Sequence, residues 1–194
     1  HGDDRRQRQM CIRDSKDTQY EGAYVKDPQL GLHNWIVSFD LNSLYPHLIM
    51  QYNLSPETLV GVQPKNMGVE NYLNEKFNLQ WARDKNVTVA PNGSMYRRDK
   101  QGFLPELMEK MYGDRVVFKK KTIEAKKEFQ KTKDPIYKNE ISRCNNIQMA
   151  KKIALNSAYG AIGNQYFRYF DVRIAEAITL GGQLSIRWVE RDVN

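Results

Sequence analysis

The sequence predicts an α+β fold, with a short mixed or antiparallel sheet and its helices followed by two long helices packed antiparallel. Two observations lead to this expectation. Short runs of aromatic and β-branched residues, typical of strands, occur in the first hundred residues. Between residues 105 and 159, apolar side chains instead recur at helical spacing over two stretches, which are separated by the turn signal Asp134-Pro135.

The first strand is expected over residues 35–39, Trp-Ile-Val-Ser-Phe, with Asp40 at its end. Residues 41–45 then turn, and Pro46 suits the first position of a helix, where its missing N–H costs nothing. A carboxylate at the tip of a buried strand is costly unless something binds it, and Mg²⁺ is a natural partner. The N–H groups of the turn could hold an anion, with Tyr45 close behind. Two interpretations stay open: a metal–triphosphate site, or a capped strand–helix junction with an incidental aspartate.

The remaining elements of the first half are short. Ser55-Pro56 is a helix-start signal, and residues 66–85 form a polar helical pattern. Residues 87–90 and 94–97 are expected to pair as a hairpin across the turn Pro91-Asn92-Gly93. At the other end of the chain, residues 171–194 predict a helix whose Gly181-Gly182 allows close packing. Its inward side chains are expected to be Ile174, Ala177, Ile178, Leu184 and Ile186.

The two long helices are expected over residues 105–133 and 136–159, as an antiparallel hairpin. The first is densely basic, and most of its lysines suit a solvated face. Two pairs stand out, because residues four apart share one face of a helix: Arg115 with Lys119, and Lys152 with Asn156. If these faces meet the turn after Asp40, they supply three cations and an amide that suit the oxygens of a triphosphate.

Composition narrows the class of protein. The chain of 194 residues suits one domain, or two parts sharing a core, and its 40% hydrophobic content is enough for a core. A formal net charge of +7 suggests a polyanionic partner. The two cysteines are too few for a disulfide framework, and no apolar run or signal-peptide pattern indicates a membrane span or secretion. Residues 1–19 are polar and aperiodic, and are expected to be a non-native or disordered arm.

Several motifs together resemble the family B DNA polymerases. Phe39-Asp-Leu-Asn-Ser-Leu-Tyr-Pro resembles their motif A, and Lys152-Ile-Ala-Leu-Asn-Ser-Ala-Tyr-Gly resembles their motif B. Further similarity lies in Gly102-Phe-Leu-Pro-Glu-Leu, Asn53-Leu-Ser-Pro-Glu-Thr and Gly163-Asn-Gln-Tyr-Phe-Arg-Tyr-Phe. The motifs run from about residue 20 to the end in the family's order, and look most like the T-even phage branch.

The resemblance implies a partial palm with motif A over residues 20–104. It also implies a fingers hairpin with motif B over residues 105–160, and a return to the palm over residues 161–194. The family's second catalytic aspartate, in an Asp-x-Asp hairpin, is not in this chain. The chain therefore looks like a fragment, and we expect it to be inactive alone.

The resemblance also implies roles for residues near motif A. Asp40 and the backbone carbonyl of Leu41 would hold Mg²⁺, of which the complete enzyme uses two ions. The N–H groups of Ser43 and Leu44 would hold the phosphates of the incoming deoxynucleotide. Tyr45 would lie under its sugar and collide with a 2′-hydroxyl.

The helical hairpin would supply the other contacts. By resemblance, Arg115, Lys119, Lys152 and Asn156 would grip the triphosphate, while Tyr159 and Gly160 would line the pocket of the nascent base pair. His47 stands where the family usually has Ser, and we expect it to be a solvated residue at the start of a helix.

The implied activity is Mg²⁺-dependent, template-directed transfer of deoxynucleotides to a primer 3′-hydroxyl. The implied partners are primer–template DNA and a deoxynucleoside triphosphate, with a sliding clamp as a further candidate and no membrane. The implied location is cytoplasmic, as for a viral protein in its host cell. The alternative is a non-catalytic nucleic-acid-binding module that uses the basic hairpin and needs neither Mg²⁺ nor Asp40.

Overall fold

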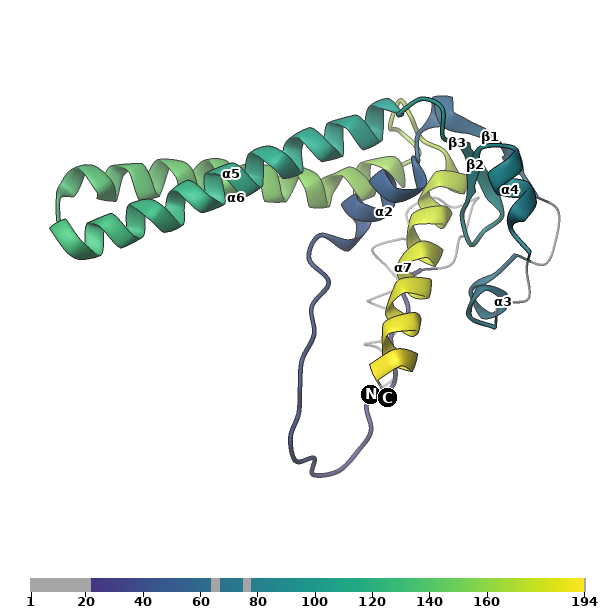
Figure 1. Cartoon of the computed structure of the whole chain (residues 1–194), viewed down its shortest axis with the longest axis horizontal. Coiled ribbons are helices and arrows are strands. Elements are labelled where there is room, and N and C mark those ends of the chain that lie inside the picture. The colour runs from purple at the N-terminus through teal and green to yellow at the C-terminus, as the bar shows by residue number, and fades with distance from the viewer. Residues whose placement is uncertain (1–21, 64–66, 75–77, 194) are drawn as a thin grey trace.

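The computed structural model describes residues 22–63, 67–74 and 78–193, and these form an α+β structure. A small sheet and the helices around it lie at one end, and a helical hairpin projects from them (Figure 1). The expected fold class is thereby confirmed. The expected arm at residues 1–19 lies outside the described residues.

The hairpin consists of α5 (Phe103–Thr132) and α6 (Pro135–Ile162). Compared with the predicted ranges, α5 begins two residues earlier and ends one residue earlier, and α6 begins one residue earlier and ends three residues later. Local signals set the turn between them. Lys133 ends α5 in the left-handed region, and the Asp134 side chain caps α6 by accepting a 2.9 Å hydrogen bond from the Ile136 N–H. Pro135 occupies the first position of α6, which tolerates its missing N–H. The turn therefore reverses the chain within two residues.

The sheet has three antiparallel strands in the order β1-β3-β2. The strands are β1 (Leu59–Val62), β2 (Val87–Val89) and β3 (Ser94–Arg97), and the β2–β3 hairpin is the one that the sequence predicted. Its turn includes Gly93 at φ +83°, where a side chain would be strained and its β-carbon would lie 3.1 Å from the Gln63 carbonyl oxygen.

Three short helical elements connect these parts. A 3₁₀ turn, η1 (Pro56–Thr58), begins at the predicted Ser55-Pro56 signal. The helical pattern of residues 66–85 is divided into α3 (Val69–Leu73) and α4 (Gln80–Asp84), while residues 66 and 75–77 lie outside the described residues. The expectation of one segment is therefore only partly correct.

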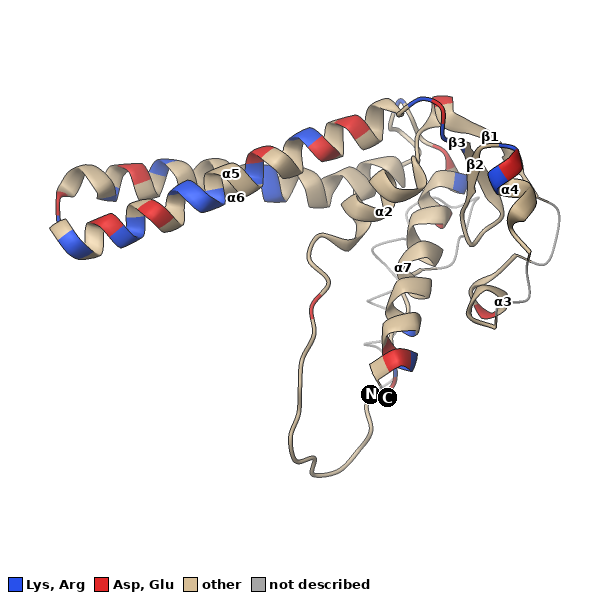
Figure 2. Ribbon diagram, in the orientation of Figure 1, with Lys and Arg blue, Asp and Glu red and all other residues tan. Residues whose placement is uncertain are grey.

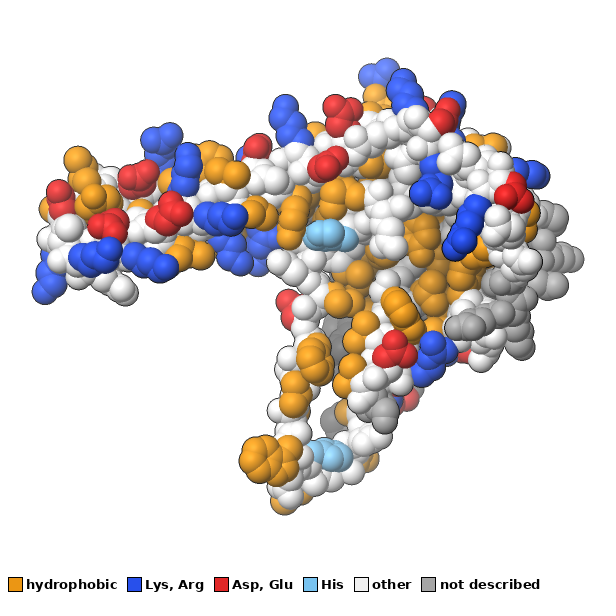
Figure 3. Space-filling view, in the orientation of Figure 1, with side chains coloured by type: hydrophobic (Ala, Val, Ile, Leu, Met, Phe, Trp, Pro, Cys, Tyr) orange, Lys and Arg blue, Asp and Glu red, His pale blue; other side chains and the backbone are white. Residues whose placement is uncertain are grey.

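The strand expected over residues 35–39 does not form. The segment begins in a bend, with Trp35 in the left-handed region at φ 60°, and it is exposed, with 98% of Trp35 and 71% of Val37 accessible. No described strand pairs with it, and Figure 1 draws this part of the chain as a long loop, whose exposed hydrophobic side chains stand out in Figure 3. A strand needs a neighbour for its N–H and C=O groups, and the described sheet lies elsewhere. The expected burial of the strand was therefore wrong for the described structure.

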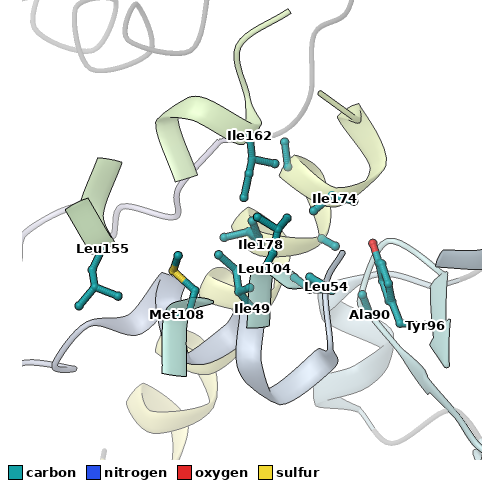
Figure 4. Packing of buried hydrophobic residues seen from close by; sticks show 12 residues of the cluster. Ile49, Leu54, Ala90, Tyr96, Leu104, Met108, Leu155, Ile162, Ile174 and Ile178 are labelled. Carbon is teal, nitrogen blue, oxygen red and sulfur yellow. The ribbon is translucent and has the colours of Figure 1, made fainter. Parts of the chain in front are cut away.

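The core lies where α2 (Leu44–Tyr52), α5, α6, α7 (Val172–Val193) and the sheet meet. Figure 4 shows Ile49, Leu104 and Ile178, from three different helices, gathered at its centre. As predicted, Ile174, Ala177 and Ile178 of α7 are fully buried. Leu184 is only half-buried and Ile186 is 37% exposed, because the second half of α7 extends past the core (Figure 1). The inward assignment of Ile186 was therefore wrong.

Close packing of α7 on α2 depends on the predicted Gly181-Gly182 pair. A β-carbon at Gly182 would lie 2.9 Å from Cε1 of Tyr45, whereas one at Gly181 would make an ordinary 3.5 Å contact with Leu48. Only the second glycine is thus required by the approach of the two helices. It places the Tyr45 ring directly against the α7 backbone.

Candidate functional site

The turn that precedes α2 is tied to the hairpin by one charged side chain. Ser43 occupies the N-cap position of α2 in the left-handed region, at φ 55° and ψ 45°, and its side chain makes no capping hydrogen bond. Arg115, in α5, donates a 3.0 Å hydrogen bond from Nη1 to Ser43 Oγ. At this contact the Arg115 face of the hairpin meets the turn after Asp40, which is the condition that the sequence analysis set for a phosphate site.

Arg115 is poorly satisfied for so buried a cation. Only 9% of the residue is exposed, and its buried Nε has no hydrogen-bond partner among the described residues. An unpaired N–H on a buried guanidinium is costly, and a negatively charged oxygen would relieve the cost. The forked donors of arginine suit phosphate oxygens in particular. The arrangement is that of an anion-binding side chain.

The first turn of α2 offers donors beside this arginine. The first N–H groups of a helix have no partner within it, and no acidic residue occupies the first turn of α2. The Ser43 carbonyl accepts the first bond of the helix, from the His47 N–H at 3.2 Å. The N–H groups of Ser43 and Leu44 precede that bond, so they suit an anion as the sequence suggested.

Two tyrosines from distant parts of the chain meet next to the turn. The rings of Tyr45 in α2 and Tyr159 in α6 lie 4.7 Å apart, centroid to centroid, and are tilted by 52°. Both are half-buried, and Gly182 backs the Tyr45 ring. Gly160, the next residue along α6, is exposed, and nothing lies within 4 Å of where its β-carbon would be. The motif A and motif B residues are thus joined by an aromatic contact.

The other predicted phosphate ligands face solvent. Lys119 on α5 and Lys152 and Asn156 on α6 are exposed, and none of their side chains forms a hydrogen bond or ion pair with another described residue. The neighbouring Lys151 differs, because its Nζ lies 2.6 Å from Asp114 on α5. The three predicted ligands are therefore not brought into contact with the Ser43 turn. In the ribbon of Figure 2, acidic residues alternate with basic residues along the hairpin.

The proposed metal ligands lie on the exposed segment. Asp40 and Leu41 are both exposed, with Leu41 at 43%. Within the described ranges, no three His, Cys, Asp or Glu residues are close enough to form a metal site. A carboxylate and a carbonyl are donors that Mg²⁺ accepts, and the ion commonly takes only one or two carboxylates together with substrate phosphates. The two oxygens fit part of such a site.

One residue that the sequence undervalued is His47. It is half-buried rather than solvated, its Nδ1 lies 2.9 Å from the Ser43 carbonyl oxygen, and its ring packs against Tyr112 of α5. The expectation of a solvated histidine was therefore wrong. Spacing could have suggested the contact, because residues 43 and 47 lie four apart and face each other across one helical turn. Nothing local in the sequence indicates Tyr112, which comes from another helix.

Among the helices that the structure describes, none has the length and apolar character needed to cross a membrane.

Proteins of similar sequence indicate the family of this chain. The sequence model of DNA polymerase family B matches residues 4–194. The chain is 31% identical over 217 residues to the DNA-directed DNA polymerase of Escherichia phage RB69, covering 90% of the chain and 24% of that protein. It is 33% identical to DNA polymerase 1 of Pyrococcus abyssi, covering 98% of the chain and 20% of that protein.

A solved structure agrees with the sequences. The family B DNA polymerase of Pyrobaculum calidifontis superposes with a TM-score of 0.61 and 26% identity, over 92% of this chain and 21% of that one. The chain spans about a quarter of the length of the phage RB69 polymerase that it matches. The similarity to the phage RB69 and T4 enzymes confirms the resemblance to the T-even branch. With its motifs in order and its fold shared, the chain belongs to DNA polymerase family B.

Proposed function

We propose that this chain forms part of the palm and the fingers of a DNA-directed DNA polymerase, which transfers deoxynucleotides to a primer 3′-hydroxyl. The observation that carries the proposal is the buried Arg115, which is bonded to Ser43 and has an unpartnered Nε. The guanidinium and the N–H groups of Ser43 and Leu44 at the start of α2 would form one anion-binding corner. A nucleoside triphosphate is the substrate that this corner would hold.

The residues around the corner have distinct roles in this proposal. Ser43 and Leu44 would donate their N–H groups to phosphate oxygens, and Arg115 would donate its fork. Lys119, Lys152 and Asn156, exposed on the two hairpin helices, would add their side chains to the triphosphate when the hairpin moves toward the palm. Such a movement would exclude water and so strengthen every charge interaction at the phosphates.

The aromatic pair of Tyr45 and Tyr159 would contact the nucleoside part of the substrate. Tyr45 is held between Tyr159 and Gly182, so its ring cannot easily withdraw from a 2′-hydroxyl placed on it. Selection of deoxyribose by collision follows from this rigidity. Tyr159 and the open surface at Gly160 would line the pocket of the nascent base pair.

Asp40 and the Leu41 carbonyl would hold Mg²⁺, with two ions in the complete enzyme and a second aspartate outside this chain. When bound there, the metal would lower the pKa of the attacking primer 3′-hydroxyl and would neutralise charge on the leaving pyrophosphate. Primer–template DNA is the second substrate, and a sliding clamp is a further candidate partner. By analogy with the phage relatives, we place the activity in the cytoplasm of an infected cell.

The test is single-nucleotide primer extension with a full-length polymerase that contains these residues. Asp40→Ala should abolish extension, and chelation of Mg²⁺ should do the same. Lys152→Ala should raise the Kd for the deoxynucleotide about tenfold, since hydrogen bonds to charged groups contribute about 1.5–3 kcal/mol. Lys151→Ala is the matched control, because the Lys151 side chain forms an ion pair with Asp114. This variant should leave the Kd for the deoxynucleotide unchanged.

Tyr45→Ala should keep extension with deoxynucleotides and admit ribonucleotides. Parental discrimination in this variant would refute the role of Tyr45. DNA binding that is independent of Mg²⁺ and Asp40, with steep salt dependence and no extension, would instead support the binding-module alternative.

A further inference from the structure

His47 and Tyr112 contact each other at the anion-binding corner, yet the proposed function assigns neither a role. Their rings lie 4.7 Å apart and meet edge to face, at 79°. Tyr112 stands one helical turn before Arg115 on α5, so the two side chains project from the same side of that helix. The imidazole therefore touches α5 beside the guanidinium of Arg115, to which the proposed function gives the phosphates.

The other side of the imidazole is bonded to the turn. Its Nδ1 lies 2.9 Å from the Ser43 carbonyl oxygen, and a carbonyl only accepts, so Nδ1 carries the proton. Besides the first backbone hydrogen bond of α2, two side chains consequently hold Ser43: His47 contacts its carbonyl and Arg115 its hydroxyl. Both contacts are internal to the corner and need no ligand.

The turn needs such support. Ser43 adopts the left-handed conformation, which is unfavourable for residues other than glycine, and no side chain caps the start of α2. An unsupported Ser43 would relax toward the ordinary region and turn its peptide groups. That relaxation would misdirect the N–H groups of Ser43 and Leu44 and move the Oγ that Arg115 contacts.

Building on the proposed function, we propose that His47 is a positioning residue for nucleotide binding. It holds Ser43 in its left-handed conformation through the Nδ1 hydrogen bond, and it aligns this turn with Arg115 through the ring contact with Tyr112. His47 touches neither the nucleotide nor the reacting atoms. Its effect should therefore appear in the affinity for the deoxynucleotide rather than in the rate of the chemical step.

Two substitutions separate the two contacts of the imidazole. In His47→Asn the amide Nδ2 can stand in for Nδ1 and donate to Ser43, while the aromatic ring is lost. In His47→Phe the ring can still pack on Tyr112, but the donor is gone. The control is His33→Phe, because His33 makes a similar contact, Nε2 to the Gln29 carbonyl oxygen at 3.0 Å, in an exposed segment away from the corner.

The variants are compared in a full-length polymerase by pre-steady-state single-nucleotide incorporation. His47→Phe should raise the Kd for the deoxynucleotide about five- to tenfold, the equivalent of one lost hydrogen bond, with the maximal rate within about twofold of the parent. His47→Asn should restore the Kd to within about twofold, and His33→Phe should leave it unchanged. A parental Kd in His47→Phe, or an Asn variant as weak as the Phe variant, would overturn the proposal.

Hydrogen exchange provides a readout that does not depend on catalysis. The amides of residues 47–49 should exchange about five- to tenfold faster in His47→Phe than in the parent, after correction for intrinsic rates, and at the parental rate in His47→Asn. Unchanged exchange in His47→Phe would overturn the positioning role. A parent that extends no primer but shows the expected exchange pattern would instead refute the proposed function while supporting the role of His47 at the turn.

Discussion

Asn53 joins the end of α2 to the start of the α5–α6 hairpin, and its removal should be among the most damaging substitutions outside the core. Its Nδ2 donates to the carbonyl oxygens of Arg97 and Lys100, at 2.7 and 2.8 Å. Its Oδ1 accepts from the Gly102 N–H at 2.8 Å, immediately before α5 begins. Asn53 itself ends α2 in the left-handed region, at φ 58°, which asparagine tolerates well.

The expected magnitude follows from these contacts. Leaving the buried Gly102 N–H unpaired costs about 2 kcal/mol, and each bond to the exposed Arg97 and Lys100 contributes about 0.5 kcal/mol. Placing alanine in the left-handed region adds about 1 kcal/mol. We therefore expect Asn53→Ala to lower the free energy of unfolding by about 4 kcal/mol. Asn53→Gly should lower the free energy of unfolding by about 3 kcal/mol, because glycine also loses the side-chain hydrogen bonds but adopts the left-handed conformation without strain.

The assay is urea unfolding of the chain at 25 °C, followed by helix circular dichroism. Asn53→Asp is the informative third variant, because it keeps the acceptor for Gly102 but places a carboxylate oxygen against the carbonyl oxygens of Arg97 and Lys100. It should therefore be less stable than the parent even though the bond to Gly102 is kept. If Asn53→Ala stayed within about 1 kcal/mol of the parent, the clamp would not contribute to stability and the reasoning would be refuted.

Two further substitutions test the packing and the electrostatics of the same region. Gly182→Ala should destabilise the chain by about 1–3 kcal/mol relative to Gly181→Ala, because only the former drives a methyl group into Tyr45. Equal stabilities of the two variants in urea unfolding would contradict the close approach of α7 to that ring. Burial would by itself raise the pKa of Glu57, but hydrogen bonds from Ser55 Oγ and the Phe103 N–H outweigh it and hold that pKa below its ordinary value of 4.5. Since the folded-state pKa is depressed, the stability that Glu57 contributes is present above about pH 4.5 and is lost as the pH falls through the folded-state pKa. Glu57→Gln should flatten this acid dependence in unfolding measured from pH 6 to about pH 3, and an unchanged profile would exclude Glu57 as its source.

The sequence predicted the elements whose signals are local. In the α5–α6 hairpin, the cap Asp134, the proline Pro135 and the apolar spacing are all signals from neighbouring residues, so the predicted bounds were correct to within a few positions. The β2–β3 hairpin has a turn that requires glycine at one position, and it too formed where expected. The identity of the site residues near Asp40 came from the order of motifs, because no spacing alone separates a metal site from a capped junction.

Features that depend on a partner distant in the sequence were predicted less accurately. The aromatic and β-branched run at residues 35–39 has the composition of a strand, but composition supplies no neighbour for its backbone, and the described segment stays unpaired and exposed. The assignment of Ile186 to the core failed for a related reason, because helical periodicity says which residues share a face and not how far the covering elements extend.

The sequence by itself thus determined an α+β segment of a family B polymerase, its long basic hairpin and the residues that we propose for nucleotide binding, since periodicity, capping and motif order are properties of the sequence. Only the tertiary structure decided that Arg115 is buried against Ser43 with an unpartnered Nε, that Tyr45 is fixed between Tyr159 and Gly182, and that His47 bridges α2 to α5. Each of these contacts joins residues from different helices. Their geometry depends on how those helices pack, which no local pattern specifies.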